Sequence, residues 1–108
     1  MHSKDSVWSL TFALCLVLFG QTEGSAATII NFDSLSDSEI LTNQFAGLTF
    51  SNATALTSGV SLNEFEFPPR SNFNVVTDDG GAIAILFSSP VLSVSGYFTY
   101  LSSLTFTA

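Results

Sequence analysis

Acidic side chains are the groups in this sequence that are best able to carry chemistry. Glu64 and Glu66 lie in residues 61–67, where alternation predicts a strand with both carboxylates on the face opposite Phe65 and Phe67. At a rise near 3.3 Å per residue they would stand roughly 6 to 7 Å apart, as the acid and base of a glycosidase can. A solvated strand face produces the same alternation. We therefore expect no catalytic residue, and keep a carboxylate-dependent glycan-active enzyme as an alternative.

A second group of acids surrounds the first predicted loop. Asp33, Asp37 and Glu39 lie close together in sequence, and Ca²⁺ takes several carboxylate and carbonyl oxygens as ligands. Asp78 and Asp79 form a smaller group, but Asp before Gly is also ordinary turn chemistry. Neither group has the EF-hand spacing. The hypothesis is a calcium site at Asp33, Asp37 and Glu39, with no other cofactor.

Three aromatic side chains are candidates for contact with sugar rings. Tyr97, Tyr100 and Phe73 could form a flat platform, because aromatic rings offer a large apolar face and Tyr adds a polar tip. The competing interpretation places such residues in the core. The sequence holds a single Trp, at position 8, so the predicted platform contains none.

The N-terminal segment has the pattern of a secretory signal. Lys4 lies in a short polar head, an apolar run follows over residues 7–19, and Ser25 and Ala27 are small. A span of the hydrocarbon core needs about 20 apolar residues, so this run is too short. We predict a signal peptide over residues 1–27, cut by signal peptidase after Ala27. A buried N-terminal helix and an uncleaved anchor are the alternatives.

Cleavage would remove most of the reactive side chains from the protein. Residues 28–108 keep seven acidic side chains against Arg70 alone, a formal charge of −6. One cation cannot neutralise a phosphate backbone, so nucleic acid is excluded as a partner. We also expect no stable membrane span in the mature part. Nucleophilic, zinc and disulfide chemistry are also excluded, because His2, Lys4 and Cys15 leave with the signal. Trp8 leaves with it as well.

The remaining residues predict an all-β domain over 28–108. Residues 74–77 and 82–87 are predicted to form a hairpin around the turn 78–81. Both faces of the second arm are apolar, which indicates a strand that is central or covered on both sides. The other predicted strands are short: 28–32, 48–56, 61–67, 90–100 and 104–108. Because the last run still alternates at Ala108, we expect the domain to be the N-terminal portion of a longer one; the alternative is a closing strand.

Several segments in a fixed order carry a family resemblance: INFDSL at 30–35, NQFAGLTFS at 43–51, SLNEFEFPP at 61–69, DDGG at 78–81 and the run 90–100. Together they resemble the N-terminal half of bacterial exosortase-sorted surface proteins of the PEP-CTERM type. The resemblance implies a jelly-roll-like or galactose-binding-like β-sandwich, exported from a Gram-negative bacterium to the cell surface or beyond. It implies no established activity, and no catalytic residue carries over. The family's C-terminal sorting tail is not in this sequence.

These observations lead to one expected function. We expect an exported, noncatalytic cell-surface or extracellular-matrix protein that contacts polysaccharide. The alternatives are the glycan-active enzyme based on Glu64 and Glu66, and a wall component stabilised by calcium.

Overall fold

The part of the chain that the structure describes folds into strands, turns and irregular segments. The computed structural model describes residues 5–9, 13–18, 27–100 and 103–107, and these contain no helix, hence none that could cross a membrane. The all-β class predicted for residues 28–108 is confirmed for the described residues. The described part holds nine strands: β1 (Asp5–Ser9), β2 (Ala13–Leu18), β3 (Thr28–Ile30), β4 (Leu48–Ser51), β5 (Ala53–Thr57), β6 (Asn74–Asp78), β7 (Ile83–Phe87), β8 (Val94–Thr99) and β9 (Thr105–Thr107).

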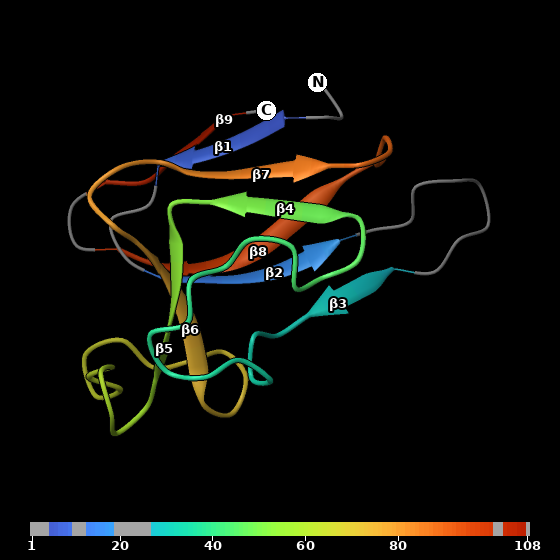
Figure 1. The fold of residues 1–108 in the computed structure, drawn as a ribbon. Helices are drawn as coiled ribbons and strands as arrows, with labels where there is room; N and C mark the ends of the chain where they lie inside the picture. The colour runs from blue at the N-terminus through green and yellow to red at the C-terminus, as the bar shows by residue number, and fades with distance from the viewer. Residues whose placement is uncertain (1–4, 10–12, 19–26, 101–102, 108) are drawn as a thin grey trace.

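The strands pair into two sets, and in Figure 1 the set that contains β1 and β7 lies above the set that contains β2 and β3. One set has the order β4-β7-β1-β9, and the other has the order β3-β2-β6-β5, with β8 on β2. Every pairing between named strands is antiparallel. β7 lies between β4 and β1, but β1 belongs to the predicted signal, so the predicted central position within residues 28–108 is not tested.

A bent two-stranded ribbon connects the two sets. β4 pairs with β7 from Leu48–Phe87 to Ser51–Ala84, and β5 pairs with β6 from Ala53–Asp78 to Thr57–Asn74. In Figure 1 the chain leaves β4, turns sharply and continues as β5 alongside β6. The half of the ribbon formed by β4 and β7 therefore belongs to one set, and the half formed by β5 and β6 belongs to the other.

The bend corrects the predicted hairpin. β6 and β7 do not pair with each other, so residues 79–82 form a corner between sets instead of a hairpin turn. Asn52 lies opposite this corner with φ of 59°, and its side-chain amide donates to the carbonyl of Ala82 at 3.3 Å. Gly80 has φ of 81°, a left-handed conformation that glycine adopts without steric cost. The same residue types suit a hairpin turn and a corner, which is why local chemistry could not separate them.

The predicted strand over residues 61–67 is also wrong. Residues 64–66 form a turn, in which the backbone N–H groups of Glu66 and Phe67 donate to the Asn63 carbonyl at 3.2 and 2.9 Å. The Asn63 side chain accepts the N–H of Phe65 at 3.2 Å, and this Asx-type turn competes locally with an extended strand. Phe65 is consequently 93% exposed, whereas Phe67 is buried.

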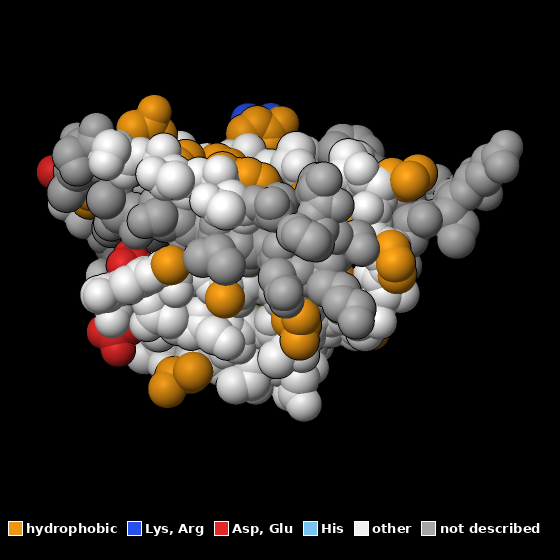
Figure 2. Space-filling view, turned by 90° about the horizontal axis from the view of Figure 1, so that it is seen from above, with side chains coloured by type: hydrophobic (Ala, Val, Ile, Leu, Met, Phe, Trp, Pro, Cys, Tyr) orange, Lys and Arg blue, Asp and Glu red, His pale blue; other side chains and the backbone are white. Residues whose placement is uncertain are grey.

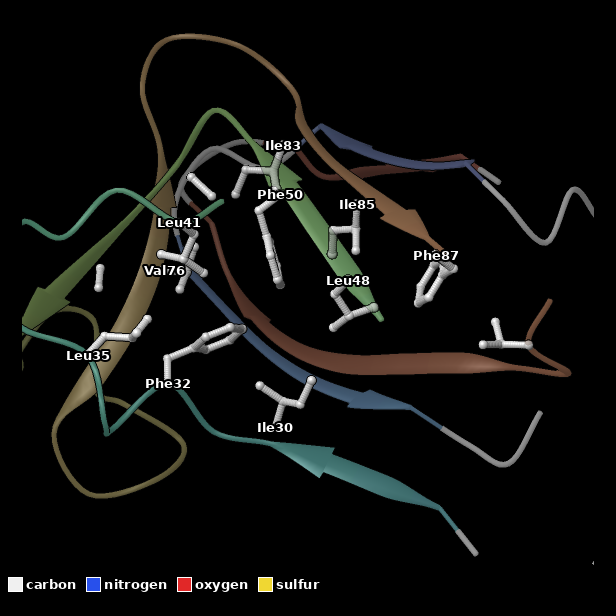
Figure 3. Close-up of a cluster of buried hydrophobic side chains, with 13 residues drawn as sticks. Ile30, Phe32, Leu35, Leu41, Leu48, Phe50, Val76, Ile83, Ile85 and Phe87 are labelled. Atoms are coloured by element: carbon white, nitrogen blue, oxygen red, sulfur yellow. The ribbon is translucent and has the colours of Figure 1, made fainter. Parts of the chain in front are cut away.

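The core lies between the bent ribbon and the segment around β3. Figure 3 shows Phe32 facing Val76 and Phe50, with Ile83 and Ile85 of β7 beyond them. The rings of Phe32 and Phe50 meet edge to face, with centroids 6.0 Å apart. This cluster draws its buried side chains from β3, β4, β5, β6 and β7 and from the loops between them. Both sets of strands are thus held against one continuous apolar cluster.

Among the residues whose burial the structure describes, Asn74 is the buried polar one, with 2% of its surface exposed. Its side-chain amide donates to the carbonyls of Phe32 at 2.7 Å and Leu35 at 2.8 Å, and its side-chain oxygen accepts the Thr57 hydroxyl at 2.7 Å. Burial of an amide is costly unless its hydrogen bonds are made, and here they are. Asn74 therefore joins the start of β6, the end of β5 and the loop after β3.

Replacement of Asn74 by Ala should destabilise the protein strongly. The carbonyls of Phe32 and Leu35 and the Thr57 hydroxyl each lose a hydrogen bond, although the Phe32 carbonyl keeps the Leu35 N–H, and we expect the free energy of unfolding to fall by about 2 to 4 kcal/mol. Urea denaturation followed by fluorescence or circular dichroism measures the change. Asn72→Ala is the matched control, because Asn72 is exposed and bonds to Asp33 through its backbone only. Equal losses in the two variants would contradict the role assigned to the Asn74 side chain.

Candidate functional site

Asp33 uses its carboxylate to hold the segment before β6. It accepts the Ser71 hydroxyl at 2.9 Å and the backbone N–H groups of Asn72 at 3.1 Å, Phe73 at 3.1 Å and Asn74 at 2.9 Å. Three successive backbone donors converging on one carboxylate fix the path of that segment. The first of the predicted calcium ligands is therefore a structural acceptor for the protein's own donors.

The charge on Asp33 is favoured by these bonds. Burial is the largest single influence and raises the pKa, but the N–H groups of Asn74, Asn72 and Phe73 and the Ser71 hydroxyl together outweigh it. The pKa of Asp33 is consequently lowered from its ordinary value. The folded state thus prefers the ionised carboxylate.

Asp37 and Glu39 are engaged in the same way. Asp37 accepts the Ser61 hydroxyl at 2.7 Å and the Thr57 N–H at 2.8 Å, and these two bonds, the first the stronger influence, lower its pKa. Glu39 accepts the Ser36 N–H at 2.8 Å, which is the main cause of its lowered pKa. A further bond from the Gln44 amide, at 3.1 Å, acts in the same direction.

The three carboxylates do not form a shared cation site. Among the described residues, no group of three or more His, Cys, Asp or Glu side chains is arranged to hold a metal ion. Each carboxylate contacts donors on a different segment of the chain. The calcium site at Asp33, Asp37 and Glu39 stays a prediction, and no geometric feature favours it. Asp78 accepts the Gly81 N–H at 3.2 Å, as its turn chemistry predicts.

Glu64 and Glu66 lack the geometry on which the enzyme hypothesis depended. They lie on the turn that replaces the predicted strand, so they do not share a strand face. Glu64 accepts the backbone N–H of Gly59 at 3.1 Å and thereby closes a local loop. The strand from which the spacing of an acid and a base was calculated is therefore not present.

The aromatic candidates lie at the surface. Tyr97 is 51% exposed, and Tyr100 and Phe73 are exposed to a similar degree. The guanidinium carbon of Arg70 lies 4.1 Å from the centroid of the Tyr97 ring, a cation–π contact. Figure 2 shows basic atoms against hydrophobic side chains at the edge of the visible face, while acidic groups lie elsewhere on it. The structure thus pairs Tyr97 with a residue that sequence reasoning did not include in the site.

The flat platform of Tyr97, Tyr100 and Phe73 stays a prediction. Alternation along β8 turns Tyr97 outward and Phe98 toward the core, and continued alternation would turn Tyr100 to the side of Phe98. No ring contact joins Tyr97, Tyr100 and Phe73 within the part of the chain that the structure describes. We therefore define the candidate site as the Arg70–Tyr97 pair. The only sequence signal for it was that Arg70 is the single cation after residue 27.

Comparison of the chain with protein-family models, with curated proteins and with solved structures found no match.

Acid should destabilise the protein through the carboxylates of Asp33, Asp37 and Glu39. Their folded-state pKa values are lowered, so their stabilisation is fully present above the unfolded pKa of about 4 and is lost as the pH falls through the lower folded values. Urea midpoints measured between pH 7 and pH 2 should therefore decline below about pH 4. Asp33→Asn should flatten this decline, whereas Asp79→Asn, a change at an exposed acid in the corner, should leave it intact. A decline of equal steepness in both variants would refute the role of Asp33.

Calcium should have little effect on stability, because the carboxylates already accept hydrogen bonds from the protein. A bound calcium would be visible, because a ligand present at a hundredfold excess over its dissociation constant stabilises the folded state by about 2.7 kcal/mol. We expect melting temperatures in millimolar CaCl₂ and in EDTA to agree within the error of calorimetry. A clear rise in CaCl₂ that Asp37→Asn removes would instead establish the predicted calcium site.

Proposed function

We propose that this chain is an exported, noncatalytic protein of the cell surface or extracellular matrix that contacts polysaccharide through Arg70 and Tyr97. The exposed cation–π pair is the observation that carries the proposal. A sugar ring packs its C–H face against an aromatic ring, and a guanidinium offers several fixed N–H donors to hydroxyl groups. The Arg70–Tyr97 pair supplies both groups at one place on the surface.

The charge of the protein sets the class of glycan. Residues 28–108 carry a formal charge of −6, and Arg70 is their one cation. A polyanionic glycan would be repelled by this net negative charge at low ionic strength, and salt would screen the repulsion over about 10 Å. We therefore propose neutral polysaccharide as the preferred ligand, with polyuronates bound only in salt.

The proposed architecture is a jelly-roll-like β-sandwich. It is supported by the bent ribbon, whose halves belong to different sets of strands, and by the apolar cluster that both sets share. Export is supported by the sequence pattern of residues 1–27, and the surface location by the resemblance to exosortase-sorted proteins of Gram-negative bacteria. The turn at residues 64–66 gives no support to the enzyme alternative.

Retention on immobilised glycans tests the proposal. The protein should be retarded in affinity gels that contain dextran or a β-glucan, and retarded by alginate only when salt is added. Tyr97→Ala and Arg70→Ala should each weaken retention about tenfold, which corresponds to about 1.4 kcal/mol. Phe65→Ala is the matched control, because Phe65 is an exposed aromatic outside the site. No retardation on any of these glycans, or an equal effect of Phe65→Ala, would refute glycan contact through this pair.

A further inference from the structure

The N-terminal strands hold positions on which three other strands depend. β8 pairs with β2 over six consecutive residues, from Ala13–Thr99 to Leu18–Val94, and β3 pairs with β2 over three. β9 pairs with β1. Within the described part of the chain, β3, β8 and β9 have no other strand partner. The predicted cut after Ala27 would therefore remove the partner of all three.

The two positions differ in their surroundings. β2 lies between β8 on one edge and β3 with β6 on the other, because Leu14 pairs with both Phe98 and Val76. β1 lies between β7 and β9. An empty position of this kind presents rows of unpaired backbone N–H and C=O groups, which natural proteins rarely leave uncovered. β7, with the sequence IAILF, contains no charge or proline that would protect its edge.

The segment that occupies the larger position shows which strand chemistry fits it. β2 has the sequence ALCLVL, an uncharged apolar run in extended conformation, antiparallel to both β8 and β3. An incoming strand can pair its main chain with a sheet edge in the same way, the mode of recognition called β-strand addition. A partner strand would thus need at least six residues, no charge and no proline.

We propose that the chain from Thr28 onward is a β-strand acceptor, and that after removal of the signal it takes an extended, uncharged apolar strand from a partner into the position that β2 fills in the uncut chain. This inference rests on the export and cleavage in the proposed function. The incoming strand runs antiparallel to β8 and restores a partner for β3. The glycan site includes Tyr97 of β8, so strand addition also orders one member of that site.

Cleavage of the purified full-length protein tests the acceptor. A protease site is placed at residues 21–24, the folded protein is cut, and the two parts are separated in mild denaturant. Hydrogen exchange should become about tenfold faster or more at the amides of β3 and β8, while β5 and β6, which pair with each other, keep their protection. Adding back a synthetic peptide of residues 4–20 should restore protection at β8. The same peptide with Leu16→Pro should not, because residue 16 has strand partners on both edges and proline removes an N–H.

The uncut chain provides a second readout. Leu16→Pro in the full-length protein should expose the amides of β3 and β8, whereas Ser93→Pro, at an exposed residue outside the strands, should not. A cut chain that stays monomeric with unchanged protection at β3 and β8 would overturn the proposal. A cut chain that keeps its protection by forming a dimer would support it and identify a second copy as the donor. Mass spectrometry of the exported protein tests cleavage separately: an N-terminus before Thr28 would contradict the processing step but not the dependence of β8 on β2.

Discussion

The hydrogen bonds of Asp33 and Asn74 are the constraint on which the described fold depends most directly. Asp33 gathers the backbone of the segment before β6, and the Asn74 side chain binds carbonyls of the loop after β3. A third contact, from Thr57, brings in the end of β5. The bonds of Asp33 and those from the Asn74 amide join segments about 40 residues apart in sequence, with separations of 38 to 42 residues, and the Thr57 bond spans 17. They therefore close a long loop whose entropy the apolar core must also offset.

The bent ribbon follows from this closure. Once β5 and β6 are held at the Asp33–Asn74 network, their continuations β4 and β7 pair beyond the corner at Asn52 and residues 79–82. The apolar side chains of both halves then reach the same cluster around Phe32 and Val76. Corner, network and core are thus mutually dependent, and a change at one of them should be felt at the others.

The same network explains why the acidic residues are poor candidates for chemistry. A carboxylate that accepts hydrogen bonds from backbone and hydroxyl donors is stabilised as an anion. It gains little when a cation or a substrate replaces those donors. Asp33, Asp37 and Glu39 all have lowered pKa values for this reason. The acidic surplus of the chain is therefore partly structural, and the contact of Arg70 with Tyr97 is the surface that we propose for a ligand.

The sequence by itself determined the all-β class and the turn chemistry at Asp78, because alternation and glycine placement are local properties. It could not distinguish a hairpin from a corner at residues 79–82, nor a strand from an Asx-type turn at residues 63–66, because each pair uses the same residue types. Only the tertiary structure decided that Arg70 covers Tyr97 and that Asp33 binds residues 71–74. Those contacts join segments far apart in the chain, and no local pattern records which distant donors a carboxylate or a ring will meet.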